Sequence, residues 1–124
     1  MYVVRTLIMA GGIGERLWPV SVKKRPKQFH KFGSSKTMIE ETIERMEKVT
    51  DEIIIITTRE QFPLMQYYLP LFPGENVIFE PMRRNTAPAI ALGSTRFSPD
   101  DIMVVVPADH VIRDEESFLK TLNK

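Results

Sequence analysis

The sequence predicts an α/β protein whose mostly parallel sheet carries helices on both faces. Short apolar runs rich in β-branched residues alternate along the chain with longer segments whose apolar residues recur at helical spacing. The runs "IIIIT" at 53–57 and "IMVVV" at 102–106 show no polar alternation. Such runs are typical of strands that are buried on both faces, which requires a layer of helices on each side of the sheet.

Local signals place the individual elements. Thr37 and Glu40 form a capping box before a segment with isoleucine and methionine at helical spacing, which predicts a helix there. Asn85 is the expected N-cap of a later helix that carries Pro88 in its first turn. Residues 10–35 read as a long loop rich in glycine, proline and lysine. The expected strands are residues 3–9, 53–57, 76–80 and 102–106, and the expected helices are residues 37–49, 60–69, 86–97 and 117–123.

The composition limits the classes of protein to consider. The 124 residues suffice for one ordinary domain with a real core. A net charge of +1, from 17 basic and 16 acidic side chains, argues against a general binder of nucleic acid or membrane surfaces. The chain has no cysteine, which excludes disulfides and thiolate chemistry within it, and it has no apolar run of about 20 residues that could span a membrane. These features fit a cytoplasmic protein.

Three glycines, Gly11, Gly12 and Gly14, follow the first expected strand. The stretch is not a Walker A loop, because GxxxxGK followed by Ser or Thr is missing. It also fails the dinucleotide-binding fingerprint, since Leu17 stands where the third glycine is required. The second strand ends in threonine rather than in an acid that could hold a ribose. A dinucleotide-binding oxidoreductase is therefore disfavoured, and a nucleoside-triphosphate loop of the GGxGxRL type fits better.

Positive charge accompanies these glycines. Glycine amides can approach phosphate oxygens because no side chain blocks them. Arg16 can form paired hydrogen bonds to a phosphate, and Lys27 adds a compact point charge. A flexible basic surface loop is the plainer alternative. The Trp-Pro pair and the "RPKQF" stretch that accompany Arg16 favour binding of a triphosphate.

Two further strand ends carry candidate binding residues. Glu80 could accept two hydrogen bonds from the N1–H and amino group of a guanine, and Asn85 with the free amides of the next helix could bind base or ribose. Alternatively, Glu80 caps a strand and Asn85 caps a helix. Asp109 either caps a turn or binds a magnesium ion, and a phosphate loop at the same sheet edge favours the metal. His110 is a poor magnesium ligand and is expected to be structural.

Three stretches together resemble a known family. "AGGIGERLWPVSVKKRPKQF", "EPMRRNTAPAIAL" and "VVVPADHVI", in this order and spacing, resemble the mannose-1-phosphate guanylyltransferases, or GDP-mannose pyrophosphorylases, among the sugar-nucleotide pyrophosphorylases. The resemblance covers nearly the whole chain. It implies a Rossmann-like sheet of the nucleotide-diphospho-sugar transferase type, of which residues 1–124 are the N-terminal, nucleotide-binding portion.

The resemblance implies a reaction in which GTP and mannose 1-phosphate give GDP-mannose and pyrophosphate, with Mg²⁺ as cofactor. The sugar phosphate would attack the α-phosphorus directly, so that no nucleophilic residue is needed. The implied roles are catalytic for Arg16 and Lys27, metal-binding for Asp109, and nucleotide-binding for Ala10, Gly11, Gly12, Gly14, Glu80, Asn85 and Thr86.

Members of this family are much longer than 124 residues, and their remaining part supplies the sugar pocket and a second metal-binding aspartate. We therefore expect this chain alone to bind GTP weakly at most, with turnover only where a homo-oligomer or another chain completes the site. Two alternatives stay open. One is a non-catalytic GTP-binding module or fragment. The other is a guanylyltransferase for a different acceptor, such as the molybdenum-cofactor enzymes, which also open with an Ala-Gly-Gly loop.

Overall fold

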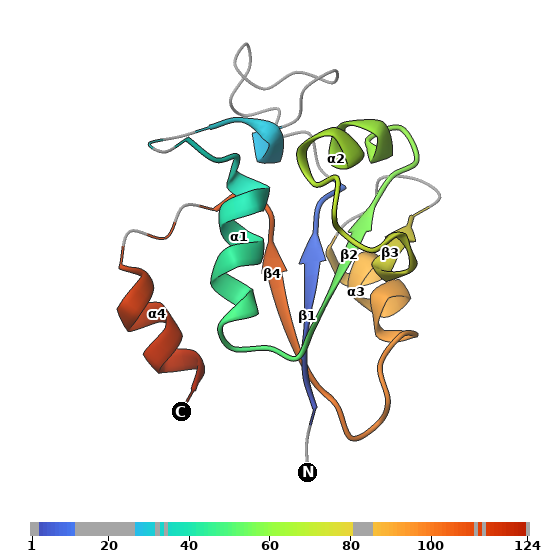
Figure 1. Ribbon diagram of the computed structural model, residues 1–124. Helices are drawn as coiled ribbons and strands as arrows, with labels where there is room; N and C mark the ends of the chain where they lie inside the picture. The colour runs from blue at the N-terminus through green and yellow to red at the C-terminus, as the bar shows by residue number, and fades with distance from the viewer. Residues whose placement is uncertain are drawn as a thin grey trace.

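The computed structural model describes residues 3–11, 27–31, 33, 35–80, 86–110, 112 and 114–123. Within these residues, four strands form one parallel sheet in the order β3-β2-β1-β4 (Figure 1). The strands are β1 (Val4–Met9), β2 (Glu52–Thr57), β3 (Val77–Phe79) and β4 (Ile102–Pro107). The helices are α1 (Met38–Glu47), α2 (Phe62–Tyr68), α3 (Thr86–Ser94) and α4 (Glu115–Leu122), and two short 3-10 turns are η2 (Lys27–Phe29) and η3 (Gly74–Asn76). The parallel α/β fold predicted from the sequence is confirmed.

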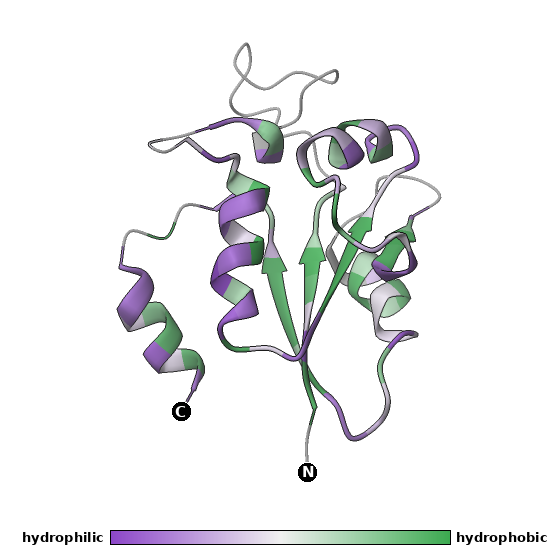
Figure 2. Ribbon diagram, viewed as in Figure 1, coloured by the Kyte–Doolittle hydropathy of each residue, from purple (hydrophilic) through white to green (hydrophobic). Residues whose placement is uncertain are grey.

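Successive strand residues face opposite sides of the sheet and build two cores. Leu7 is in register with Ile54 and Val105, and these side chains share a core with Ala89 of α3. The next position, Ile8, faces the other core, which α1 and α2 cover and which Phe118 of α4 joins. Figure 2 shows largely apolar strands, and α1 and α4 with both polar and apolar residues. The predicted cover of helices on both faces is therefore present.

The capping box at the start of α1 is also confirmed. The Glu40 amide donates to Thr37 Oγ1 at 3.3 Å, and the Thr37 amide donates to Glu40 Oε1 at 3.2 Å. Two amides of the first turn that have no partner within the helix are thereby satisfied. Replacing such a cap typically costs about 1 kcal/mol, so this pair contributes to the position at which the helix begins.

All four helices differ at one boundary or more from the sequence-based expectation, and α1 ends at Glu47 rather than at 49. Helix α3 ends at Ser94, because the amides of Thr95, Arg96 and Phe97 donate to carbonyls three residues back, in tighter turns. Helix α4 begins at residue 115 rather than 117, because Asp114 caps it by accepting a hydrogen bond from the Ser117 amide at 3.0 Å. Helix α2 covers only Phe62–Tyr68, since the proline at position 70 disfavours helical backbone in the residue before it.

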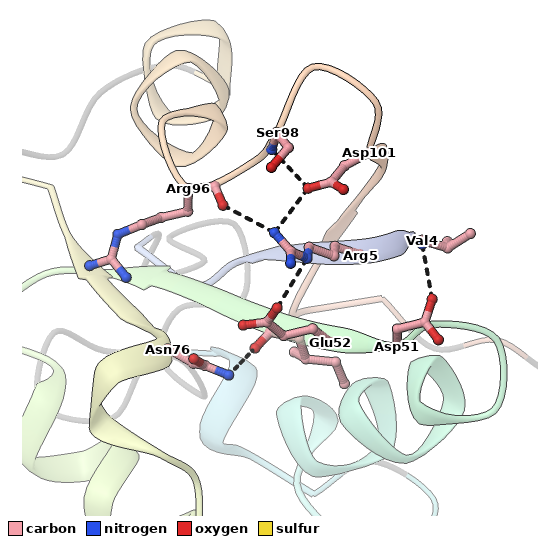
Figure 3. A network of polar contacts seen from close by, with 9 residues as sticks. Val4, Arg5, Asp51, Glu52, Asn76, Arg96, Ser98 and Asp101 are labelled. Carbon is pink, nitrogen blue, oxygen red and sulfur yellow. Dashed lines mark hydrogen bonds and ion pairs between the residues drawn. The ribbon is translucent and has the colours of Figure 1, made fainter. Parts of the chain in front are cut away.

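An ion-pair network connects β1, β2 and the loop before β4 at the end of the sheet where β1 begins (Figure 3). The Arg5 guanidinium lies 3.0 Å from Glu52 Oε2 and donates to Asp101 Oδ2 at 2.9 Å. Asp101 also accepts from the Ser98 amide at 2.8 Å. One arginine thus joins the beginning of β2 to the loop before β4. The charged groups lie at the opposite end of the strands from the glycine stretch, so we assign them a structural role.

Helix α3 approaches β1 so closely that only glycine fits at one position. A Cβ built on Gly93 would lie 2.8 Å from Leu7 Cδ1 and 3.2 Å from Leu7 Cγ. Leu7 is fully buried, so its side chain has little room to move. Gly93 therefore sets the spacing between this helix and the sheet.

We predict that Gly93→Ala destabilises the protein. Overpacking a core costs roughly 1–3 kcal/mol, and so close a contact with a fully buried side chain belongs to the upper half of that range. The better helix propensity of alanine returns about 1 kcal/mol, which leaves a net loss of about 1–2 kcal/mol. Urea unfolding of the protein at its natural full length measures this loss. Gly74→Ala is the matched control, because a Cβ there has no atom within 4 Å. An unchanged midpoint for Gly93→Ala would contradict the packing argument.

Within the described part of the chain, no helix is long and apolar enough to cross a membrane.

Candidate nucleotide-binding site

Four chain segments meet at the carboxyl ends of the strands. The Glu80 amide donates to the Thr57 carbonyl at 2.8 Å, and the Ala10 amide donates to the Ile56 carbonyl at 2.8 Å. On the other side of β1, the Ala108 amide donates to the Met9 carbonyl at 3.1 Å. These bonds extend the parallel ladder by one residue beyond β3, β1 and β4. They place Glu80, Gly11 and Asp109 at one edge of the sheet, where ligands of open α/β folds bind.

Glu80 and Gly11 are in direct contact at this edge. A Cβ built on Gly11 would overlap Glu80 Oε1 and would lie 3.1 Å from Glu80 Cδ. Glu80 is only 7% exposed, so its carboxyl group is packed against the backbone of the glycine stretch. Among the described residues, Gly33 is the only one with a positive φ. Gly11 is therefore needed for close approach to Glu80 rather than for an unusual backbone conformation.

Three buried polar side chains hold the start of the glycine stretch. Thr57 Oγ1 and Gln28 Nε2 both donate to the Ala10 carbonyl, each at 3.0 Å. Gln61 Nε2 donates to the Gly11 carbonyl at 2.8 Å. Gln28 Nε2 also donates to Gln61 Oε1 at 2.7 Å, which joins the two amides. Buried carbonyls that leave a sheet must find partners elsewhere, and here side chains from β2, η2 and the start of α2 supply them.

Helix α2 also contacts the η2 turn. Phe29 is fully buried and stacks on Tyr68 of α2, with ring centroids 5.6 Å apart and planes inclined by 19°. The turn contains Lys27 and Gln28, so it belongs to the "RPKQF" stretch. Gln28 of this turn therefore lies beside Ala10, although residues 12–26 separate Gly11 from the turn in the sequence.

Asp109 lies next to this edge with a half-buried carboxylate. Its Oδ1 lies 3.9 Å from His110 Nε2, and the imidazole is largely exposed. No group of three or more acidic, histidine or cysteine side chains that could hold a metal occurs among the described residues. Magnesium is commonly held by one or two carboxylates together with substrate phosphates and water. A single half-buried carboxylate fits an ion that arrives with a triphosphate, and it does not fit a closed protein cage.

Comparison with known proteins identifies the family of this chain. The nucleotidyl transferase family model matches residues 5–124. This chain belongs to the nucleotidyl transferase family. Two curated relatives are mannose-1-phosphate guanylyltransferases, from Salmonella muenchen at 39% identity over 94% of this chain and from Escherichia coli K12 at 43% identity over 90%. The resemblance drawn from the three motifs is confirmed.

A solved structure shows the same fold for this nucleotidyl transferase chain. The crystal structure of a Thermus thermophilus protein, described as a mannose-1-phosphate geranyltransferase, matches with a TM-score of 0.81 and 32% identity. The match covers 97% of this chain and 36% of that one. The chain spans about a quarter of the length of the curated relatives, 26% and 25%.

The nucleotidyl transferase chain brings together only some of the predicted site residues. Ala10, Gly11, Glu80 and Asp109 are placed at one edge of the sheet as described above. Of Lys27 and Thr86, the structure describes the backbone, in η2 and at the first position of α3. Four predicted residues lie outside the described residues: Gly12, Gly14, Arg16 and Asn85.

Gln28, Gln61 and Thr57 were missed by sequence reasoning as parts of the site. Gln28 stands in the "PKQF" element, so the motif itself could have indicated that this residue belongs to the site. Gln61 stands in no motif, and within the helix expected at 60–69 a glutamine looks like any polar surface residue. Only the fold shows that it is buried and that it contacts the glycine stretch.

Proposed function

We propose that the protein is a mannose-1-phosphate guanylyltransferase and that residues 1–124 form its nucleotide-binding part. The observation that carries the proposal is the contact of Glu80 with Gly11 at the strand ends, beside Asp109. A group for reading a base, a glycine stretch for phosphates and a carboxylate for a metal then lie on one edge of the sheet. The identity of 39–43% to guanylyltransferases supports the same assignment.

The chemistry is transfer of a guanylyl group. An oxygen of mannose 1-phosphate attacks the α-phosphorus of GTP, and the bond from that phosphorus to the oxygen bridging to the β-phosphate breaks. The electron pair leaves with pyrophosphate, and GDP-mannose is the other product. Such a transfer requires alignment and charge neutralisation rather than a covalent intermediate.

The residues of the glycine stretch fit the phosphate end of GTP. Amides of Ala10, Gly11, Gly12 and Gly14 would bind phosphate oxygens, since glycine allows close approach. Arg16 would hold the phosphates that leave, and Lys27 would neutralise charge at the reacting phosphates. Asp109 would hold a magnesium ion, which when bound supplies positive charge to the triphosphate.

The opposite side of the glycine stretch fits the base. Glu80 would accept hydrogen bonds from the guanine N1–H and amino group, a pair of donors that adenine lacks. Asn85 and Thr86 would contact base or ribose at the start of α3, where amides without helical partners are available. The carboxylate of Glu80 is therefore proposed to determine the preference for GTP.

Because the chain spans about a quarter of its relatives, the sugar pocket would come from residues beyond these 124, from a homo-oligomer or from a completing chain. The protein would work in the cytoplasm, where a chain without cysteine needs no disulfide.

Pyrophosphate release tests the proposed function. The protein at its natural full length is incubated with magnesium, with GTP, ATP, UTP or dTTP, and with mannose 1-phosphate or glucose 1-phosphate. Release only with GTP and mannose 1-phosphate is the expected result. Magnesium-dependent GTP binding without release would favour a non-catalytic GTP-binding module, and release with GTP and another acceptor would favour a different guanylyltransferase. No preference for GTP would overturn the role of Glu80.

A further inference from the structure

We propose that Gln61 is a positioning residue, which together with Gln28 fixes the two ends of the phosphate-binding stretch relative to each other. One end is Gly11, and the other is the η2 turn that contains Lys27. This inference rests on the proposed function, because it assigns the two ends to phosphate binding. It adds a role for α2, which carries no motif that the sequence singles out.

The hydrogen bonds orient both amides without ambiguity. Gln61 Nε2 faces the Gly11 carbonyl at 2.8 Å and Gln28 Nε2 faces the Ala10 carbonyl at 3.0 Å. A carbonyl oxygen only accepts, so each of these side-chain atoms must be the NH₂ group. Gln61 Oε1 is then the group that faces Gln28 Nε2, at 2.7 Å. Both amide hydrogens of Gln28 are thereby used.

Because both glutamine side chains are buried, their hydrogen bonds are not easily exchanged for bonds to water. Gln28 and Gln61 are each 3% exposed, so water does not replace a lost partner easily. A buried amide without its partner is costly, and flipping either side chain would set two oxygens against each other. The geometry of Gly11 is therefore coupled to that of the η2 turn through two side chains.

Helix α2 serves as the rigid support of this coupling. Gln61 directly precedes α2, and its amide and that of Phe62 donate to the Thr58 carbonyl, each at 3.1 Å. At the other end of the helix, Tyr68 stacks on Phe29 of η2. The helix thus contacts the turn at both of its ends. Contacts that hold binding groups in place before a ligand arrives reduce the ordering cost of binding.

The test compares three variants of the protein at its natural full length. Gln61→Met keeps the size of the side chain and removes the amide. Gln66→Met makes the same change on the exposed side of α2 and is the matched control. Gly93→Ala controls for lost stability, because its packing defect lies against Leu7 in the core on the opposite face of the sheet from α2.

Two measurements are made. The first is kcat/KM for GTP in pyrophosphate release, at a temperature where all variants are folded. We expect Gln61→Met to lower it roughly 10- to 100-fold, since small displacements of phosphate-binding groups are costly, while both controls stay within about threefold of wild type. The second is hydrogen–deuterium exchange without nucleotide, in peptides that contain Gly11 or Gln28. Exchange there is expected to be at least about tenfold faster in Gln61→Met and unchanged in Gln66→Met.

The two measurements separate this inference from the proposed function. If the wild-type protein does not use GTP, the proposed function fails, and the exchange measurement still decides whether Gln61 holds the two ends. Unchanged exchange in Gln61→Met would overturn the inference. So would an activity loss in Gly93→Ala as large as that in Gln61→Met, because stability alone would then explain the effect.

Discussion

Gly11→Ala is expected to lower kcat/KM for GTP about 100-fold, equivalent to about 2.7 kcal/mol of transition-state stabilisation. The alanine methyl group would occupy the position of Glu80 Oε1. Glu80 is buried and its amide is tied to Thr57, so its carboxyl group has to turn away from the place where it is proposed to read guanine. The preference for GTP over ATP should therefore fall together with the activity. Pyrophosphate release with each nucleotide measures both effects.

A second substitution isolates the contact. In a Glu80→Ala background the added methyl group meets no carboxylate, so Gly11→Ala should change GTP selectivity by less than about threefold there. Gly74→Ala, where a Cβ meets open space, is the matched control for a glycine-to-alanine change. Full GTP selectivity in Gly11→Ala alone would contradict both the contact and the assigned role of Glu80.

Asp109→Asn is expected to lower kcat about 100- to 1,000-fold and to weaken the apparent affinity for magnesium at least about tenfold. Asparagine keeps the shape of the side chain and caps a turn about as well as aspartate, but it lacks the charge that a hard cation requires. The substitution therefore separates the two roles that the sequence allowed for this residue. Pyrophosphate release, titrated with magnesium, is the measurement.

The control is Asp100→Asn, an exposed aspartate in the loop before β4. It removes the same charge at the opposite end of the same strand, so it should leave kcat within about twofold of wild type. A capping role for Asp109 would appear as a wild-type magnesium dependence in Asp109→Asn. That result would remove Asp109 from the proposed metal site.

The fold was predictable where local signals are strong. The run "IIIIT" needs burial on both faces whatever its neighbours are, and β2 is buried from Ile53 to Thr57. The capping box of Thr37 and Glu40 determined the start of α1 within a few residues. Asp114 was not recognised as the cap of α4, because an aspartate in a polar stretch is a weak signal without a clear apolar period after it.

The sequence predicted the motif residues of the candidate site, but it did not predict the side chains that hold those residues in place. Glycines beside basic residues indicate phosphate binding because few other ligands require that combination. Glu80 and Asp109 could be placed at one edge because parallel strands align their carboxyl ends. Gln61 could not be found in this way, since a hydrogen bond from a glutamine to a backbone carbonyl leaves no pattern in a sequence.

The sequence by itself determined the succession of strands and helices along the chain, the parallel sheet and the edge of the sheet at which the motifs lie. These features follow from periodicity and from the direction of the strands. Only the tertiary structure decided that Gly11 touches Glu80, that Gly93 touches Leu7 and that two buried glutamines join Gly11 to the η2 turn. The physical reason is that such contacts depend on the relative placement of segments far apart in the chain, which close packing determines to within fractions of an ångström.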